Sequence, residues 1–221
     1  MPLERIFDER DINELLTQNA GGEHGARNAA LILSGVCWGL TPLEQSLVST
    51  ESVIAPNGQL YRTWVLPSHE SYNGKSRELY TEDHLVPFFQ KYIDVRLKKE
   101  WGTGGHSHQA LLPDKPFLLN DNGERYRINT TAKGHRSAKA MHDQLRKMIK
   151  NSGLYDATPA SYRASFIKLM YESGAKWTDL KGLTGIKDKR TLEGHVRPHE
   201  RELESILSKI FSRVKMPRSL E

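Results

Sequence analysis

The chain has 221 residues, with 32 Lys and Arg, 27 Asp and Glu and a single cysteine. This length suits one domain, and 37% apolar residues are enough to form its core. Because one cysteine cannot form an internal disulfide, a disulfide-built secreted scaffold is excluded, and we expect a cytoplasmic protein. The charged N-terminus does not resemble a signal peptide, and no apolar stretch is long enough to span a membrane.

The net charge of +5 is unevenly distributed along the chain. Residues 1–122 contain 11 basic and 16 acidic side chains, a net charge of −5. Residues 123–221 contain 21 basic and 11 acidic side chains, a net charge of +10. A basic half of this kind indicates a surface for a polyanion such as DNA. The alternative is a basic surface that has no partner and simply contacts water.

The first part of the chain predicts helices. Apolar residues with helical spacing predict a short helix over 11–18 and a mostly buried helix over 25–40. Thr41-Pro42 is typical of a helix start, since threonine is a good N-cap and proline is tolerated in the first turn.

Short β-prone runs follow, with turn residues between them. The turns Asn57-Gly58 and Asn73-Gly74 separate runs at 53–54, 60–66 and 77–80. Asn-Gly between β-prone runs is typical of hairpins. We therefore expect one small three-stranded antiparallel sheet.

Helices return after this sheet. Apolar residues three and four apart predict an amphipathic helix over 85–97, and a loop rich in Gly and His follows at 101–116. His106 and His108 in this loop have no acidic residue near them in the sequence, so we expect no metal site. The sequence also has no glycine-rich phosphate-binding loop, and we expect no cofactor.

The last part of the chain predicts a series of helices. A helix over 131–151 combines an apolar stripe with a basic face, and Thr158-Pro159 starts the next one. Shorter helices are expected over 177–183 and 190–196, and a final helix over 200–214 has a broad apolar stripe. That stripe packs either on its own domain or on another protein. The fold class is therefore α+β, mostly helical.

This order of elements resembles the catalytic domain of tyrosine recombinases, the phage integrase family. The block ARNAALILSGVCWGLTPLEQSLV resembles the family's buried helix and its Gly-Leu-Arg-x-x-Glu-Leu segment, and SYNGKSREL resembles its sheet hairpin. The block at 151–196 resembles the His-x-x-Arg helix, the Leu-Gly-His turn and the tyrosine helix. The resemblance covers residues 10–214, nearly the whole chain.

The resemblance implies a single domain over 1–221, with a core at 10–197 and a C-terminal helix and tail at 198–221. Because about ten residues precede the match, we expect no N-terminal core-binding domain of the kind with which the family clamps DNA. Residues after the family's tyrosine often pack on a neighbouring protomer. The corresponding candidates for a homo-oligomer or a partner recombinase are Leu203, Ile206, Leu207, Ile210 and Phe211.

The family's catalytic residues are mostly replaced when they are carried over position by position. The first arginine, the hairpin lysine, the two histidines and the tyrosine fall on Thr41, Tyr72, Ala160, Ile186 and His195. The arginine of His-x-x-Arg is kept as Arg163, and Lys75 replaces the hairpin lysine if the alignment shifts. Because strand cleavage needs these cations, acids and the nucleophile together, the resemblance implies a catalytically inactive protein.

A DNA-binding surface is nevertheless expected from the basic residues. The resemblance places 131–139 at a helix start in the major groove, where Arg136 suits a guanine and Lys133 a phosphate. Lys75 and Arg77 are expected at a hairpin tip, reaching the minor groove or facing water, and Arg163 binds either a phosphate or an internal acid. The full set of candidates is Lys75, Arg77, Lys133, His135, Arg136, Lys139, Arg163, Lys187, Lys189 and Arg190.

The sequence is therefore interpreted as a catalytically inactive, tyrosine-recombinase-like protein that binds double-stranded DNA. It would be associated with the nucleoid and act as a regulator or accessory factor of a phage or other mobile element. One alternative is an active recombinase that uses His195 or a displaced tyrosine as nucleophile. The other is a protein-interaction module that has lost DNA binding.

Overall fold

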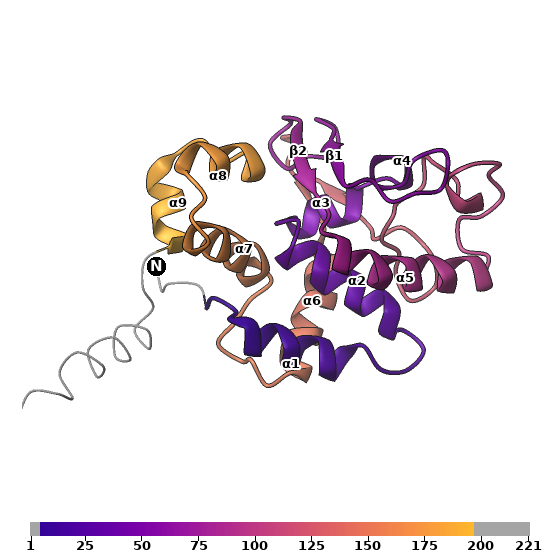
Figure 1. The fold of residues 1–221 in the computed structure, drawn as a ribbon, viewed down its shortest axis with the longest axis horizontal. Helices are drawn as coiled ribbons and strands as arrows, with labels where there is room; N and C mark the ends of the chain where they lie inside the picture. The colour runs from indigo at the N-terminus through magenta and orange to yellow at the C-terminus, as the bar shows by residue number, and fades with distance from the viewer. Residues whose placement is uncertain (1–4, 197–221) are drawn as a thin grey trace, which may run out of the picture.

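The computed structural model describes residues 5–196, which form a mostly helical fold with two short β-hairpins (Figure 1). The chain begins with α1 (Glu9–Asn19), α2 (Gly25–Val36), α3 (Pro42–Leu47) and α4 (Thr50–Val53). It continues with β1 (Thr63–Leu66), β2 (Arg77–Tyr80), a 3₁₀ helix at Asp83–Leu85, α5 (Val86–Lys98) and a 3₁₀ helix at His108–Ala110. The last described elements are β3 (Asn129–Thr130), β4 (Arg136–Ser137), α6 (Lys139–Asn151), α7 (Ala160–Glu172), α8 (Trp177–Thr184) and α9 (Lys189–Val196).

Within residues 5–196 a helix is found in each region where one was expected, with most of the expected faces buried, and the helix expected over 200–214 lies outside the described residues. In α6 the buried residues are Met141, Leu145, Met148 and Ile149, the apolar stripe read from the sequence. In α5, Phe89 and Tyr92 are fully buried, but Phe88 is 42% exposed. The 3.6-residue period therefore predicted which elements are helical, and it predicted the edges of the buried faces less well.

The expected three-stranded sheet is wrong, because the described residues form two two-stranded sheets. β1 pairs with β2 in antiparallel register, but residues 53–54 do not form the third strand. The amides of Thr50 and Glu51 donate to the carbonyls of Lys115 and Pro113, which satisfies the first turn of α4. Val53 then completes that helix, and the strand is reduced to one bridge between residues 54 and 60.

The expected helix over 131–151 is also shorter than predicted. It begins at Lys139, and β3 and β4 form a hairpin before it. The amide of Thr131 donates to the carbonyl of His135, and its hydroxyl accepts from the His135 amide at 3.1 Å. Gly134 closes this turn with φ +79°, a conformation that favours glycine. Residues 131–136 therefore lie on a hairpin and not at a helix start.

The α7 helix connects two hydrophobic clusters. The larger one surrounds α2 and α5, where the rings of Trp38 and Phe89 stack with centroids 4.3 Å apart. The smaller one contains Phe166 and Leu192 and lies among α7, α8 and α9, which form a group at one side of the molecule (Figure 1). Tyr162 of α7 belongs to the first cluster. Residue 163, between them in sequence, is therefore held at the junction.

Within residues 5–196, no helix is long and apolar enough to cross a membrane. No group of three or more His, Cys, Asp or Glu side chains in this part of the chain is placed to hold a metal ion. The residues expected to contact another protomer, at 203–211, lie outside the described residues.

Gly39 provides a test of the packing between α2 and α7. Its φ is +61°, and a Cβ at this position would overlap the ring of Phe166. We expect Gly39→Ala to lower the free energy of unfolding by about 2 kcal/mol or more, because left-handed backbone strain adds to overpacking. Urea denaturation measures this change.

Gly182→Ala is the matched control for that substitution. Gly182 lies in α8, and a Cβ there would meet nothing within 4 Å. The control should raise the free energy of unfolding by about 0.5–1 kcal/mol, because alanine has the higher helix propensity. If Gly39→Ala is as stable as the unmodified protein, the described contact between Gly39 and Phe166 is wrong.

Candidate functional site

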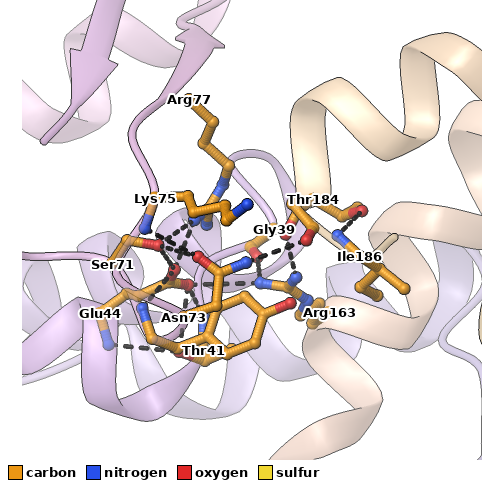
Figure 2. Close-up of polar contacts among 12 residues, drawn as sticks. Gly39, Thr41, Glu44, Ser71, Asn73, Lys75, Arg77, Arg163, Thr184 and Ile186 are labelled. Atoms are coloured by element: carbon orange, nitrogen blue, oxygen red, sulfur yellow. Dashed lines mark hydrogen bonds and ion pairs between the residues drawn. The ribbon is translucent and has the colours of Figure 1, made fainter. Parts of the chain in front are cut away.

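A buried carboxylate, Glu44, lies between two guanidinium groups (Figure 2). Its Oε1 is 2.5 Å from Nη1 of Arg77, and its Oε2 is 3.3 Å from Nη1 of Arg163. The carboxylate comes from α3, and the two arginines come from β2 and α7. We call these three residues the Glu44 triad.

The start of α3 positions the carboxylate. The hydroxyl of Thr41 accepts from the Glu44 amide, and the Thr41 amide donates back to Glu44 Oε2 at 2.9 Å. This capping box is the pattern expected where Thr is followed three residues later by Glu, and Pro42 supports it from the first turn. The prediction that Thr41 caps a helix is confirmed, and the same cap directs Glu44 into the interior.

Arg163 forms the internal ion pair that the sequence left open as an alternative. It is 8% exposed, and besides Glu44 it donates to the carbonyls of Gly39, at 3.1 Å, and Thr184. Burial lowers the pKa of Arg163, which the charge of Glu44 only partly opposes. The ring of Tyr72 covers the guanidinium, with its centroid 4.7 Å from Cζ. Arg163 is thus bound on several sides by its own protein.

The expectation that Arg77 faces DNA or water at a hairpin tip is wrong. Residues in β2 alternate between buried and exposed, and the register with β1 turns Arg77 inward, where it is 6% exposed. Its Nη1 donates to Glu44 and to Ser71 Oγ, whereas its Nε and Nη2 are buried with no partner among the described residues. Two guanidinium groups share one carboxylate, so the triad has a net charge of +1.

Glu44 is ionised at neutral pH. Burial alone would raise its pKa, but the hydrogen bond and charge of Arg77 and the charge of Arg163 outweigh burial and lower the pKa below the ordinary 4.5. A carboxylate of this kind does not suit general acid catalysis, because it holds no proton near pH 7. The triad stabilises charge and does not supply a proton.

The loop at 67–76, between β1 and β2, lies over the triad and joins it to α8. The amide of Tyr72 donates to Glu44 Oε1 at 3.2 Å. Asn73 donates its Nδ2 to the Gly185 carbonyl at 2.9 Å, and its Oδ1 accepts from the Lys75 amide at 3.1 Å. Gly185 has φ +69° and ends α8 as its C-cap. This loop is therefore attached to the connection between α8 and α9.

Four of the six positions carried over from the family's catalytic residues come together here. These four are Thr41, Tyr72, Arg163 and Ile186, and Ile186 donates its amide to Thr184 Oγ1 beside the triad (Figure 2). Ala160 is the exposed first residue of α7, and His195 is half-buried on α9.

The ten basic candidates for DNA binding are in three different environments. Arg77 and Arg163 are buried in the triad. Three are exposed but already have a partner. Arg136 donates hydrogen bonds to backbone carbonyls, and Lys139 and Lys189 form ion pairs with Asp143 at 2.7 Å and with Glu193 at 3.1 Å. Within residues 5–196, the exposed candidates without an ion pair are Lys75, Lys133, His135, Lys187 and Arg190.

Arg136 lies on β4, so its expected place at a helix start is wrong. Its Nη1 donates to the His69 carbonyl at 2.9 Å and its Nη2 to the Ser71 carbonyl at 3.1 Å. These bonds hold the 67–76 loop against the β3–β4 hairpin and occupy the two-pronged edge that a guanine contact would need. Arg136 therefore acts as a link between two loops.

Sequence reasoning missed Glu44, the residue around which this site is organised. Thr41 and Glu44 have the spacing of a capping box, which was a readable sign that the Glu44 side chain folds back on the helix start. No local pattern shows that two later arginines reach it, because they are 33 and 119 residues away in the chain.

No family model matches the sequence, and no curated protein matches it. Solved structures do match. XerA recombinase superposes with a TM-score of 0.68 at 13% identity, over 98% of this chain and 68% of that chain. This chain has a tyrosine-recombinase-like fold.

Two further recombinase-like neighbours were solved with DNA. The XerH site-specific recombinase in a post-cleavage complex with its difH substrate gives a TM-score of 0.63 at 15% identity, over 93% of this chain and 53% of that one. The Tn1549 transposon integrase with a circular intermediate DNA gives a TM-score of 0.60 at 13% identity, over 95% of this chain and 67% of that one. The recombinase-like fold of this chain thus spans about half to about two thirds of these proteins.

Glu44→Gln tests the triad. We expect the free energy of unfolding to fall by about 3–5 kcal/mol at pH 7, because the substitution leaves two buried guanidinium groups without their counter-ion. Since the pKa of Glu44 is lowered in the folded state, its contribution is present above its unfolded pKa and lost as the pH falls. The gap between the variant and the unmodified protein should therefore shrink on acidification, as measured by urea denaturation.

Glu70→Gln is the control, because its effect on stability should depend on pH in the opposite direction. Burial raises the pKa of Glu70, so the stability associated with its neutral form is present at low pH and lost as the pH rises. Any deficit of this variant should then shrink as the pH rises. If Glu44→Gln instead behaves like Glu70→Gln, or costs nothing, the triad does not hold an ionised carboxylate.

Proposed function

We propose that this chain is a DNA-binding protein that does not cleave DNA and acts as a regulator or accessory factor of a phage or other mobile element. The Glu44 triad is the observation that supports this most. Arg163 is engaged with Glu44, Gly39 and Thr184 and is covered by Tyr72, so it is not displayed toward a scissile phosphate.

The surrounding positions support the absence of catalysis. Thr41, Ala160 and Ile186 replace charged or proton-donating residues of the family, and none of them can carry a charge. Removing one donor from a site that stabilises transition-state charge costs about 10²- to 10³-fold in rate. Three such losses together leave negligible strand cleavage.

DNA binding is supported by exposed basic residues on segments that hydrogen bonds hold together. Arg136 bonds the β3–β4 hairpin to the 67–76 loop, and Asn73 bonds that loop to the α8–α9 connection. These three segments and the first turn of α9 carry the five exposed candidates that have no ion pair within residues 5–196. We call the following residues the basic surface: Lys75, Lys133, His135, Lys187 and Arg190.

We also propose that the domain binds DNA from this one face, as part of the nucleoid. One face covers part of a duplex circumference, so a second copy or a partner recombinase would bind alongside it. The apolar residues at 203–211 are the proposed contact. The XerH and Tn1549 proteins, whose folds this chain resembles, were both solved on DNA.

The salt dependence of duplex binding tests the DNA-binding proposal. The basic surface contains four Lys and Arg residues besides His135. If each contacts one phosphate, they predict a slope of about −3.6 in a plot of log affinity against log salt, or about 150-fold weaker binding between about 50 and 200 mM salt. Fluorescence anisotropy with a random duplex measures it. Lys133→Gln and Arg190→Gln should each reduce the slope by about 0.9.

Lys91→Gln is the charge-matched control, since Lys91 is exposed on α5 and lies outside the basic surface. Its slope should equal that of the unmodified protein. Absence of binding at low salt, or a slope near zero, would refute DNA binding and favour the protein-interaction alternative.

A covalent trapping assay tests the absence of cleavage. A nicked suicide duplex should give no protein–DNA adduct on a denaturing gel, whereas XerH on its difH substrate serves as the positive control. Tyr72→Phe and His195→Ala are included because these residues are the tyrosine over Arg163 and the residue at the family's nucleophile position. An adduct that either substitution abolishes would establish the active-recombinase alternative in place of our proposal.

A further inference from the structure

A cavity of about 610 Å³ lies between the two hydrophobic clusters. Its wall includes residues of β2, α7 and α8, and Figure 1 shows β2 next to α8. Trp38 and Leu79 line it from the larger cluster. Phe166, Met170 and Leu183 line it from the smaller one. Small-molecule sites in proteins are mostly apolar and have volumes of about 300–1,000 Å³, so this cavity has the size of a ligand site.

The Trp38 wall of the cavity is held in place by ring packing. The Trp38 ring stacks on Phe89 with centroids 4.3 Å apart and meets the Trp64 ring edge-on at 5.1 Å. Trp38 and Phe89 are fully buried. Because protein cores are close-packed, these contacts fix the orientation of the indole. This part of the wall is therefore formed before any ligand binds.

Trp38 also has an unused hydrogen-bond donor. Its Nε1 is buried and has no acceptor within residues 5–196. The neighbouring Trp64 shows the usual arrangement, in which Nε1 donates to Thr81 Oγ1 at 3.2 Å. Buried indole N–H groups normally have such a partner, since an unpaired one loses its bond to water and gains nothing. A molecule in the cavity that carries an acceptor oxygen would supply the partner of Trp38.

The charges around the cavity disfavour an anion. Cys37 lines it, and burial raises the pKa of the Cys37 thiol to about 12, so this group is neutral. Exposed polar residues form the mouth, where Arg62 pairs with Asp83, and Nδ1 of His84 is 3.2 Å from Glu82. Two carboxylates and one guanidinium give the mouth a net charge of −1 when His84 is neutral. A field of this sign repels an anionic ligand.

We propose that the cavity binds a small, neutral aromatic molecule whose carbonyl oxygen accepts a hydrogen bond from Nε1 of Trp38. The rings of Trp38 and Phe166 match a flat aromatic body, which the apolar wall removes from water. The molecule contacts both hydrophobic clusters. The inference goes beyond the proposed function and does not depend on whether the protein binds DNA.

The fluorescent ketone prodan, a neutral naphthalene with one carbonyl oxygen, is the probe for this site. We expect its emission to shift to the blue and to saturate as the protein is added. Its propyl analogue, in which a CH₂ group replaces the carbonyl, should compete about fivefold more weakly, the effect of one hydrogen bond. The anion anilinonaphthalene sulfonate should compete about tenfold more weakly than the ketone. Equal competition by either analogue, or absence of saturable binding, overturns the inference.

NMR spectra show whether the ketone reaches Trp38. On titration with prodan, the indole N–H signal of Trp38 should move downfield, as expected for a new hydrogen bond. The methyl signal of Met170 should follow the same saturation curve, and the indole signal of Trp101, which lies outside the cavity, should stay fixed. Trp38→Phe identifies the indole signal and should weaken binding about fivefold. A fixed Trp38 signal in the presence of saturating prodan refutes the proposed hydrogen bond.

Leu183→Trp tests the place of the site by filling the cavity. The larger side chain should weaken prodan binding at least about tenfold, because it overlaps the space of the ligand. Lys181→Trp is the matched control, since Lys181 is exposed on α8 and does not line the cavity. Unchanged binding by Leu183→Trp places the probe elsewhere and overturns the inference. A Met170 signal that moves with protein concentration alone also overturns it, because a second copy of the chain then fills the cavity.

Discussion

The burial of an ionised carboxylate between two guanidinium groups is the interaction on which the architecture around α7 depends. Removing a charge from water costs several kcal/mol, and a buried ion is tolerated only if its partners are well placed. Glu44 meets this condition with α3, β2 and α7 supplying one member each. The three elements must therefore assemble together. Arg163 extends the constraint to α8 through the Thr184 carbonyl, which places the smaller hydrophobic cluster relative to the larger one.

The same constraint gives Arg163 a structural role that does not depend on catalysis. Arg163 has a structural partner in Glu44, and the capping residue Thr41 fixes that partner. Substitution of Arg163 would leave Glu44 and Arg77 in an unbalanced buried network, so we expect it to destabilise the fold. The cations of the proposed DNA-binding surface are exposed, on loops and the first turn of α9.

The sequence predicted the elements that depend on local pattern and missed those that depend on distant partners. Periodicity located the buried stripe of α6, and Thr41-Pro42 located the start of α3. The strand expected at 53–54 became helical because carbonyls some 60 residues away cap that segment. Arg77 was expected outside because whether a strand residue faces in or out depends on the register of its pairing, which the sequence does not display.

Charge counted along the chain also differs from charge gathered on a surface. The +10 of residues 123–221 indicated that the C-terminal part supplies most of the DNA-binding surface, and the candidate Lys75 belongs to the part with a net charge of −5. The loop that carries Lys75 lies beside the α8–α9 connection because the uncharged Asn73 bonds it to Gly185, and Arg136 holds that loop against the β3–β4 hairpin. The proposed affinity for DNA therefore depends on neutral hydrogen bonds as much as on the number of cations. The exposed cations of these separate loops stay near one another only while these bonds hold.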